Sequence, residues 1–286
     1  MIYTFMAVYA GEFRIERMCR VLGVGRSGYY AWRSRSPSQR ADGDEVLLTK
    51  IQQEYRISRG TYGSPRIHAA LHKQGVKCGR KRVARLMRLH NLTGRKRQKR
   101  HPVTTQRDGN AVASLNLLQQ EFSALAPNQK WVSDITYIET AEGWLYLASI
   151  LDLFSRKVVG WAMADHMETS LVEDALKMAL LQRQPEAGLL HHSDQGRQYT
   201  SAAYQDRLAN AHCQVSMSRV GNCYDNAAME SFIGTLKSEC ATQPFATRAQ
   251  ARTAIFEFIE AWYNRQRLHS ALEYLSPAEF ERKSDH

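Results

Sequence analysis

Apolar and β-branched positions divide the second half of the chain into strands and helices. Strands are predicted over residues 131–138, where β-branched and aromatic residues dominate, and over 145–151, which is almost continuously apolar. Residues 158–163 follow a turn and are predicted to form a hairpin partner. An apolar stripe then predicts a helix over 171–184, and residues 189–194 resemble another short strand.

The remaining apolar stripes predict helices over 201–211, 225–241 and 248–267, with a short strand between the first two. Three strands, a helix, a strand, a helix, a short strand and further helices indicate a mixed α/β layer fold. A Rossmann domain is not indicated, because the glycine fingerprint that binds a dinucleotide phosphate is absent.

Two short helices are predicted in the first half. Ser64-Pro65 is a helix start, and apolar residues at helical spacing follow it. Gly75 and Gly79 bracket a break, after which Val83, Leu86 and Met87 mark a second helix. Two short helices joined by a glycine-containing turn are typical of a helix-turn-helix-like unit. A weaker copy of this arrangement lies upstream, at residues 15–30, and such pairs are also common in proteins that do not bind DNA.

Positive charge is concentrated on the second of these helices and beyond it. The chain has 39 Lys and Arg against 28 Asp and Glu, a net charge of +11. Residues 66–100 contain thirteen Lys or Arg and no acid. A solvated helix face is the ordinary interpretation of a charge run, and an acidic membrane surface is another. A run of one sign over this length favours nucleic acid as the partner.

Other compositional features limit the class of protein. The five cysteines are scattered without a CxxC pair, which argues against a disulfide framework or zinc site and fits a reducing cytosol. No apolar run reaches the ~18 residues of a membrane-spanning helix. The first residues do not resemble a signal peptide. These features together predict a cytoplasmic protein.

Three carboxylates fall where burial should be expensive. Asp134 lies within the first predicted strand, Asp194 ends the fourth, and Glu230 lies beside the apolar stripe of its helix. A salt bridge or helix cap would explain any one of them, and Asp225 is expected merely to cap its helix. Asp152 is ambiguous in the same way.

Three converging carboxylates repel one another unless cations neutralise them, and hard oxygen ligands suit Mg²⁺ or Mn²⁺. Two such ions can activate an attacking oxygen and stabilise the leaving oxygen of a phosphodiester. The basic chain is thus a candidate for nucleic-acid phosphoryl transfer. His191 and His192 precede Asp194 and are expected to be mainly positional.

The spacing and the surrounding motifs resemble one known family. Sixty positions separate Asp134 from Asp194, and 35 residues lie between Asp194 and Glu230. This is similar to the D, D, 35, E signature of retroviral integrases and insertion-sequence transposases. The words WVSDITYI, LDLFSRKVVGW, HSDQG, GNCYDNAAME and YNRQRLHSAL resemble transposases of the IS3 family, specifically the product of its second reading frame.

The resemblance implies an RNase-H-like catalytic core of the retroviral integrase type, preceded by an α-helical helix-turn-helix-like DNA-binding region. It also implies a cytoplasmic protein that acts at the bacterial nucleoid. It assigns the metal ions, and hence the catalysis, to Asp134, Asp194 and Glu230. By analogy with integrases, Asn226 and Lys237 would contact the DNA end from the helix face of Glu230. Arg265 and His269 would contact phosphate, although capping of the preceding helix explains them equally well.

We therefore expect a helix-turn-helix-like region at 1–60, a basic helical region at 61–100, a linker at 101–124 and a catalytic core at 125–286. The basic region is expected to bind double-stranded DNA through eight residues: Arg80, Lys81, Arg82, Arg85, Arg88, Arg95, Lys96 and Arg97. The hypothesis is a transposase that cleaves and joins DNA with two Mg²⁺ or Mn²⁺ ions, acting as a homo-oligomer on element ends and target.

Two other functions remain open at this point. One is a DNA-binding regulator with a degenerate catalytic fold, and the other is a nuclease of the same fold that cuts without joining. In the IS3 family the second-frame product is commonly fused to a first-frame product, so such a fusion is a further expected partner.

Overall fold

The computed structural model describes residues 1–35, 38–95, 114–219 and 223–284. These residues form two compact units, Met1–Gln53 and Glu54–His286. The division falls within helix α4 (Gln39–Ile57), a few residues before the boundary expected near residue 60. Lys96, Arg97 and most of the expected linker lie outside the described residues.

The first unit is helical. It contains α1 (Ile2–Val8), α2 (Ile15–Leu22), α3 (Arg26–Ser34) and the first part of α4. The helix α2 ends at Gly23, whose φ of 66° is the left-handed conformation that glycine adopts without a Cβ penalty. A small core of buried side chains holds the unit together: Met6, Met18, Cys19 and Tyr29.

The second unit begins with the predicted helical pair, α5 (Ser64–Lys73) and α6 (Arg80–Leu89), which pack on each other. Pro65 occupies the first turn of α5, where its missing N–H costs nothing. Ile67 and Leu71 of α5 and Val83 of α6 are completely buried, as the apolar stripes predicted. The basic side chains of α6 therefore lie on the helix faces that do not pack into this core.

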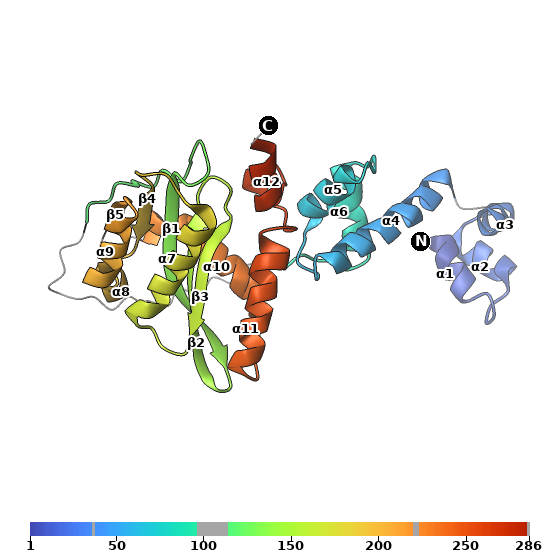
Figure 1. Cartoon of the computed structure of the whole chain (residues 1–286). Helices are drawn as coiled ribbons and strands as arrows, with labels where there is room; N and C mark the ends of the chain where they lie inside the picture. Colours follow the sequence, from blue (N-terminus) through green and yellow to red (C-terminus); the bar gives the residue numbers. More distant parts are fainter. Residues whose placement is uncertain (36–37, 96–113, 220–222, 285–286) are drawn as a thin grey trace. The chain divides into compact units, whose positions relative to one another are not determined.

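A five-stranded mixed sheet forms the centre of the second unit (Figure 1). Its strands are β1 (Lys130–Thr140), β2 (Gly143–Asp152), β3 (Val158–Ala164), β4 (Leu190–Ser193) and β5 (Gln214–Met217). They lie in the order β3-β2-β1-β4-β5. The first three form an antiparallel meander, and β4 and β5 run parallel to β1. The mixed α/β fold expected from the sequence is confirmed.

One face of the sheet is covered by α7 (Thr169–Arg183), α8 (Arg197–Thr200) and α9 (Ala202–Asn210). These helices bury an apolar core with Trp131 and Ile150 of the sheet. Gly160 of β3 permits the close approach of α7, because a Cβ there would lie 2.3 Å from the Ala175 carbonyl oxygen. The near-continuous apolar pattern of β2 follows from coverage of both sheet faces.

The opposite face carries α10 (Ala227–Glu239), which follows the short 3₁₀ turn η1 (Cys223–Asn226), and α11 (Arg248–Phe256). Ile150 belongs to the α7 side, so its neighbour Ser149 faces the other way, and the Ser149 hydroxyl lies 3.7 Å from the Met229 sulfur of α10. The chain ends with the 3₁₀ turn η3 (Ser270–Leu272) and α12 (Pro277–Ser284).

The helix predicted over 248–267 differs from the structure in its second half. After Phe256 it widens into a π-helix, η2 (Glu257–Tyr263). Wider i→i+5 hydrogen bonds replace the α-helical pattern, as from Asn264 N–H to the Ile259 carbonyl at 3.0 Å. The wider turn buries Phe258, Trp262 and Tyr263 together.

Among the residues described, no helix combines the length and the apolar character that crossing a bilayer requires.

Candidate active site

Asp134 lies in the central strand, on the face that α10 covers. The sheet register pairs it with Ser149, whose hydroxyl contacts α10, and directly paired residues share a face. The Asp134 carboxylate accepts a hydrogen bond of 2.7 Å from the backbone N–H of Ile135. The sequence thus places an acid in the middle of a sheet, at a position whose neighbours are buried apolar and hydroxyl residues.

Asp194 follows β4, the parallel neighbour of β1. The register pairs Val132 with His192, and its continuation by two residues brings Asp194 beside Asp134 on the same face. Asp194 accepts a hydrogen bond of 3.0 Å from the Gly196 N–H, which closes the turn after the strand. The short strand predicted at this position therefore presents its terminal acid to the centre of the sheet.

Glu230 lies in the first turn of α10, next to Met229, which packs against Ser149. Helix α10 thus carries Glu230 to the same face of the sheet as the two aspartates. Three elements that are distant in sequence bring one carboxylate each to one region.

The pKa of Asp134 reflects its proximity to the other two carboxylates. Burial raises the pKa of Asp134 to about 8, and the negative charges of Asp194 and Glu230 contribute to that rise. Lys237 acts in the opposite direction. A cation held by the three carboxylates would favour the ionised form of Asp134, since opposite charge lowers the pKa of an acid.

The donor set, three carboxylates, fits a hard divalent cation. Within the described part of the chain, however, no three His, Cys, Asp or Glu side chains are already gathered closely enough to hold a metal. Repulsion between like charges opposes such a cluster in the protein alone. The residues therefore fit the ion chemically, and side-chain adjustment is needed to complete its ligand set.

Two further residues predicted to contact DNA lie beside this region. Asn226 is 7% exposed, and its amide donates to the Ser133 carbonyl of β1 at 3.2 Å, so it fixes the start of α10 against the central strand. Lys237 holds its ammonium 4.6 Å from the ring centroid of Tyr137. That cation–π contact keeps a positive charge close to the carboxylates.

The two histidines before Asp194 are buried and structural. Burial lowers the pKa of His191 to about 3 and that of His192 to about 4, so both are neutral at physiological pH. His191 is hydrogen-bonded to the Tyr204 hydroxyl at 3.1 Å. The two ring nitrogens of His192 are hydrogen-bonded to the hydroxyls of Ser216, at 2.8 Å, and Ser218, at 3.0 Å. These bonds tie β4 to its neighbours and support the positional role expected for the pair.

Asp225 has a role that the sequence did not predict. Its completely buried carboxylate does not cap α10 but accepts hydrogen bonds from the side chains of Asn116, Gln120 and Arg219, at 2.9 to 3.1 Å. The Arg219 guanidinium holds the pKa of Asp225 well below its usual range. Asp225 therefore joins Arg219 and the segment of Asn116 and Gln120 to the entrance of α10. No local pattern could reveal Asn116 and Gln120 as its partners, because they lie about a hundred residues away.

The predicted DNA-binding side chains of the basic region are distributed around α6. Arg80, Lys81 and Arg88 are exposed, whereas Arg82 and Arg85 are half-buried. Arg95 is exposed and donates to the Ser238 carbonyl at the end of α10, at 3.3 Å. The exposed members place positive charge on the surface of α6 and just after it.

Arg265 and His269, the last two residues predicted to contact DNA, differ in exposure and charge. Arg265 is exposed. The ring of His269 packs edge-on against that of Tyr263, with 4.8 Å between the ring centroids. Burial holds the pKa of the His269 imidazole well below the usual value. His269 is therefore neutral and offers no charge to a phosphate.

Comparison with known proteins agrees with this architecture. A family model described as "Integrase core domain" matches residues 124–223, and a second of the same description matches residues 211–277. A model described as "HTH-like domain" matches residues 42–100. Fold and matches together define an integrase-core protein with a helix-turn-helix-like DNA-binding region.

The curated relatives are transposases and proteins of insertion elements. The chain is 43% identical to the transposase InsF of insertion sequence IS3A from Escherichia coli, over 99% of both chains. It is 46% identical to an uncharacterized 31 kDa protein of insertion element IS600 from Shigella sonnei, over 93% of this chain and 98% of that one. The chain belongs to the IS3 family of transposases and corresponds to the second-reading-frame product.

Among solved structures, the catalytic core domain of HTLV-2 integrase in complex with magnesium is similar to 55% of this chain and 98% of that chain, with a TM-score of 0.43 and 18% identity.

Proposed function

We propose that this transposase cleaves insertion-sequence ends and joins them to target DNA, with Asp134, Asp194 and Glu230 as its catalytic carboxylates. The observation that carries the proposal is that two strands and a helix bring these three half-buried acids to the same face of the sheet. Burial and the two neighbouring negative charges make the ionised form of Asp134 unstable in the protein alone. A site that contains three acids and penalises the ionisation of Asp134 is suited to a cationic cofactor.

Two Mg²⁺ or Mn²⁺ ions, when bound, would supply Lewis-acid activation of the attacking oxygen and stabilisation of the leaving oxygen. The chain's own residues do the rest. Asp134 and Asp194, whose carboxylates accept hydrogen bonds from backbone N–H groups at 2.7 and 3.0 Å, would provide oxygen ligands, and Glu230 is positioned by the packing of α10. Asn226 anchors the N-terminal end of that helix to β1.

The basic surface and Lys237 would position the DNA. Exposed Arg80, Lys81 and Arg88 offer phosphate contacts on α6, which is the type of helix that enters the major groove in helix-turn-helix proteins. Lys237, close enough to Asp134 to lower the pKa of that acid, is placed to contact a strand that enters the site. The remaining basic residues expected to bind DNA, Arg82, Arg85, Arg95 and Arg265, would extend this phosphate-binding surface. Because two DNA ends must be brought together, we expect an oligomer on DNA.

A joining assay tests the proposal. The full chain is incubated with a plasmid that carries the DNA flanking its own gene, with Mg²⁺ or with EDTA, alone and as a fusion with the upstream reading-frame product. We expect branched or circular joined products with Mg²⁺ and none with EDTA, because joining creates such molecules and hydrolysis does not. Linear cleavage products alone would identify a nuclease. Tight DNA binding with no product in either form would identify a regulator.

A further inference from the structure

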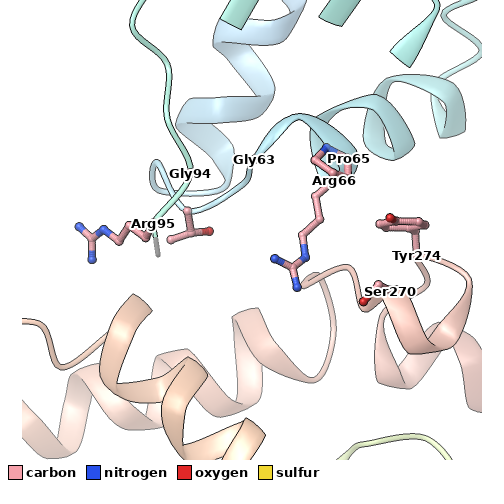
Figure 2. A pocket seen from close by; sticks show the side chains of 8 residues that line it. Gly63, Pro65, Arg66, Gly94, Arg95, Ser270 and Tyr274 are labelled. Carbon is pink, nitrogen blue, oxygen red and sulfur yellow. The ribbon is translucent and has the colours of Figure 1, made fainter. Parts of the chain in front are cut away.

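A polar groove of about 370 Å³ lies between the helix-turn-helix-like pair and the C-terminal segment, both within the second unit (Figure 2). One wall comes from the start of α5 and the segment after α6, with Arg66 and Arg95. The other wall comes from the segment around η3, with Ser270 and Tyr274. Arg66 extends from α5 towards the C-terminal segment, where its Nε donates to the Leu268 carbonyl at 2.9 Å.

Positive charge exceeds negative charge around this groove. Burial and the nearby Arg267 guanidinium lower the pKa of Arg66, and the Glu239 carboxylate acts in the opposite direction. Glu239 is already engaged by Arg267, through contacts of 2.7 to 3.1 Å. The Glu239 carboxylate therefore lies near two guanidinium groups. Arg95 adds a further cation at the edge of the groove, where its guanidinium points away from Arg66 and donates to the Ser238 carbonyl at 3.3 Å (Figure 2).

The bonding of Arg66 leaves part of its guanidinium available. Among the described residues, Arg66 makes one hydrogen bond, which its Nε donates to the neutral carbonyl of Leu268. Its Tyr62 contact, with 5.7 Å between the guanidinium carbon and the ring centroid, uses the face of the group and not its N–H donors. A partly buried guanidinium with donors left over is suited to bidentate recognition of an anion.

The environment beneath the groove is consistent with a cationic field. After burial, the charges of Arg267, Arg66 and Arg156 are what hold the pKa of His269 far below its usual value. A field that disfavours a further positive charge favours a negative one.

We infer that this groove binds a phosphate of the DNA backbone, with Arg66 and Arg95 as its cations and the Ser270 and Tyr274 hydroxyls as further donors. The inference rests on the proposed function in taking DNA as the ligand. A phosphate held between the two walls would bridge the helix-turn-helix-like pair and the C-terminal segment of the catalytic domain. DNA engagement would then fix how these two parts dock.

A charge placed in the groove tests the inference. Ser270→Asp puts a carboxylate on the wall opposite Arg66, where it would pair with the guanidinium and repel phosphate. Ser284→Asp, on the exposed end of α12, makes the same charge change outside the groove. Binding of the full chain to a random-sequence duplex of roughly 30 base pairs is measured by fluorescence anisotropy. The buffer contains EDTA, and the KCl concentration is varied in a series.

We expect Ser270→Asp to weaken binding about tenfold and to reduce the slope of log K against log [KCl] by about 1, the value for one lost phosphate contact. Ser284→Asp should change neither quantity appreciably. Arg95→Gln, at an exposed side chain whose loss does not threaten folding, should reduce the slope as well, compared with Arg282→Gln on α12.

The inference is overturned if Ser270→Asp and Arg95→Gln bind like their controls while the wild-type chain binds the duplex. Wild-type protein that does not bind the duplex at all would overturn the proposed function together with this inference. Because the assay contains no divalent ion, a defect in chemistry cannot imitate either result.

Discussion

Asp194→Asn is expected to reduce DNA cleavage and joining by about 10³-fold or more, while DNA binding stays within about twofold of wild type. The amide can still accept the hydrogen bond from the Gly196 N–H, so the turn after β4 should persist. What it removes is one negatively charged ligand of the proposed metal site. The loss would be measured as single-turnover rates of end cleavage and strand joining with Mg²⁺.

The matched control is Asp206→Asn, which makes the same change at an exposed position of α9. Both variants lose one negative charge, so a general electrostatic effect on DNA binding should appear equally in the two. Joining by Asp194→Asn at the rate of Asp206→Asn would show that Asp194 is not part of the catalytic site.

Arg267→Ala is expected to lower the free energy of unfolding by about 3–5 kcal/mol, because it leaves Glu239 buried without the guanidinium that hydrogen-bonds to it. The side chains of the two residues are 5% and 7% exposed, and the pair joins the end of α10 to the segment after η2. Trp262 also donates to Glu239 at 3.2 Å, so the uncompensated charge would lie under an aromatic cluster. Urea unfolding measures the change.

Two comparisons separate a buried charge from a lost contact. Lys283→Ala removes an ion pair with Glu273 whose side chains are 67% and 76% exposed, and it should cost less than about 1 kcal/mol. The double variant Arg267→Met with Glu239→Leu should recover most of the stability, because apolar replacement of both partners removes the desolvated charge. A double variant no more stable than Arg267→Ala would show that packing, and not charge, dominates at this site.

The sequence predicted the elements that carry the three acids because their patterns are local. The strand around Asp134 is marked by its own β-branched neighbours, and the helix of Glu230 by the apolar stripe through Met229, Phe232 and Leu236. The convergence of the acids was inferred from their places on adjacent predicted elements, and the resemblance to integrases implied it as well. The sheet register accounts for that convergence physically, since it pairs β1 with β2 and β4.

Features that depend on distant partners were beyond the sequence. Asp225 was predicted to cap its helix, and only the fold brings Asn116 and Gln120 to its carboxylate. The π-helix of η2 was missed for a related reason. Its apolar spacing also fits an α-helix, and the side-chain contacts of Trp262 and Asn264 with Glu239 and Val158 are long-range. Long-range pairing leaves no periodicity in the chain.

Strand joining by Glu230→Gln tests the central claim most directly. The variant keeps the size and hydrogen-bonding capacity of the side chain on α10 and removes the anionic ligand that completes the proposed site. With Mg²⁺ and the element's own ends, we expect joined DNA from the wild-type chain or its fusion, none above background from Glu230→Gln, and equal DNA binding by both. Joined products from Glu230→Gln at the wild-type rate would contradict the assignment of the three carboxylates.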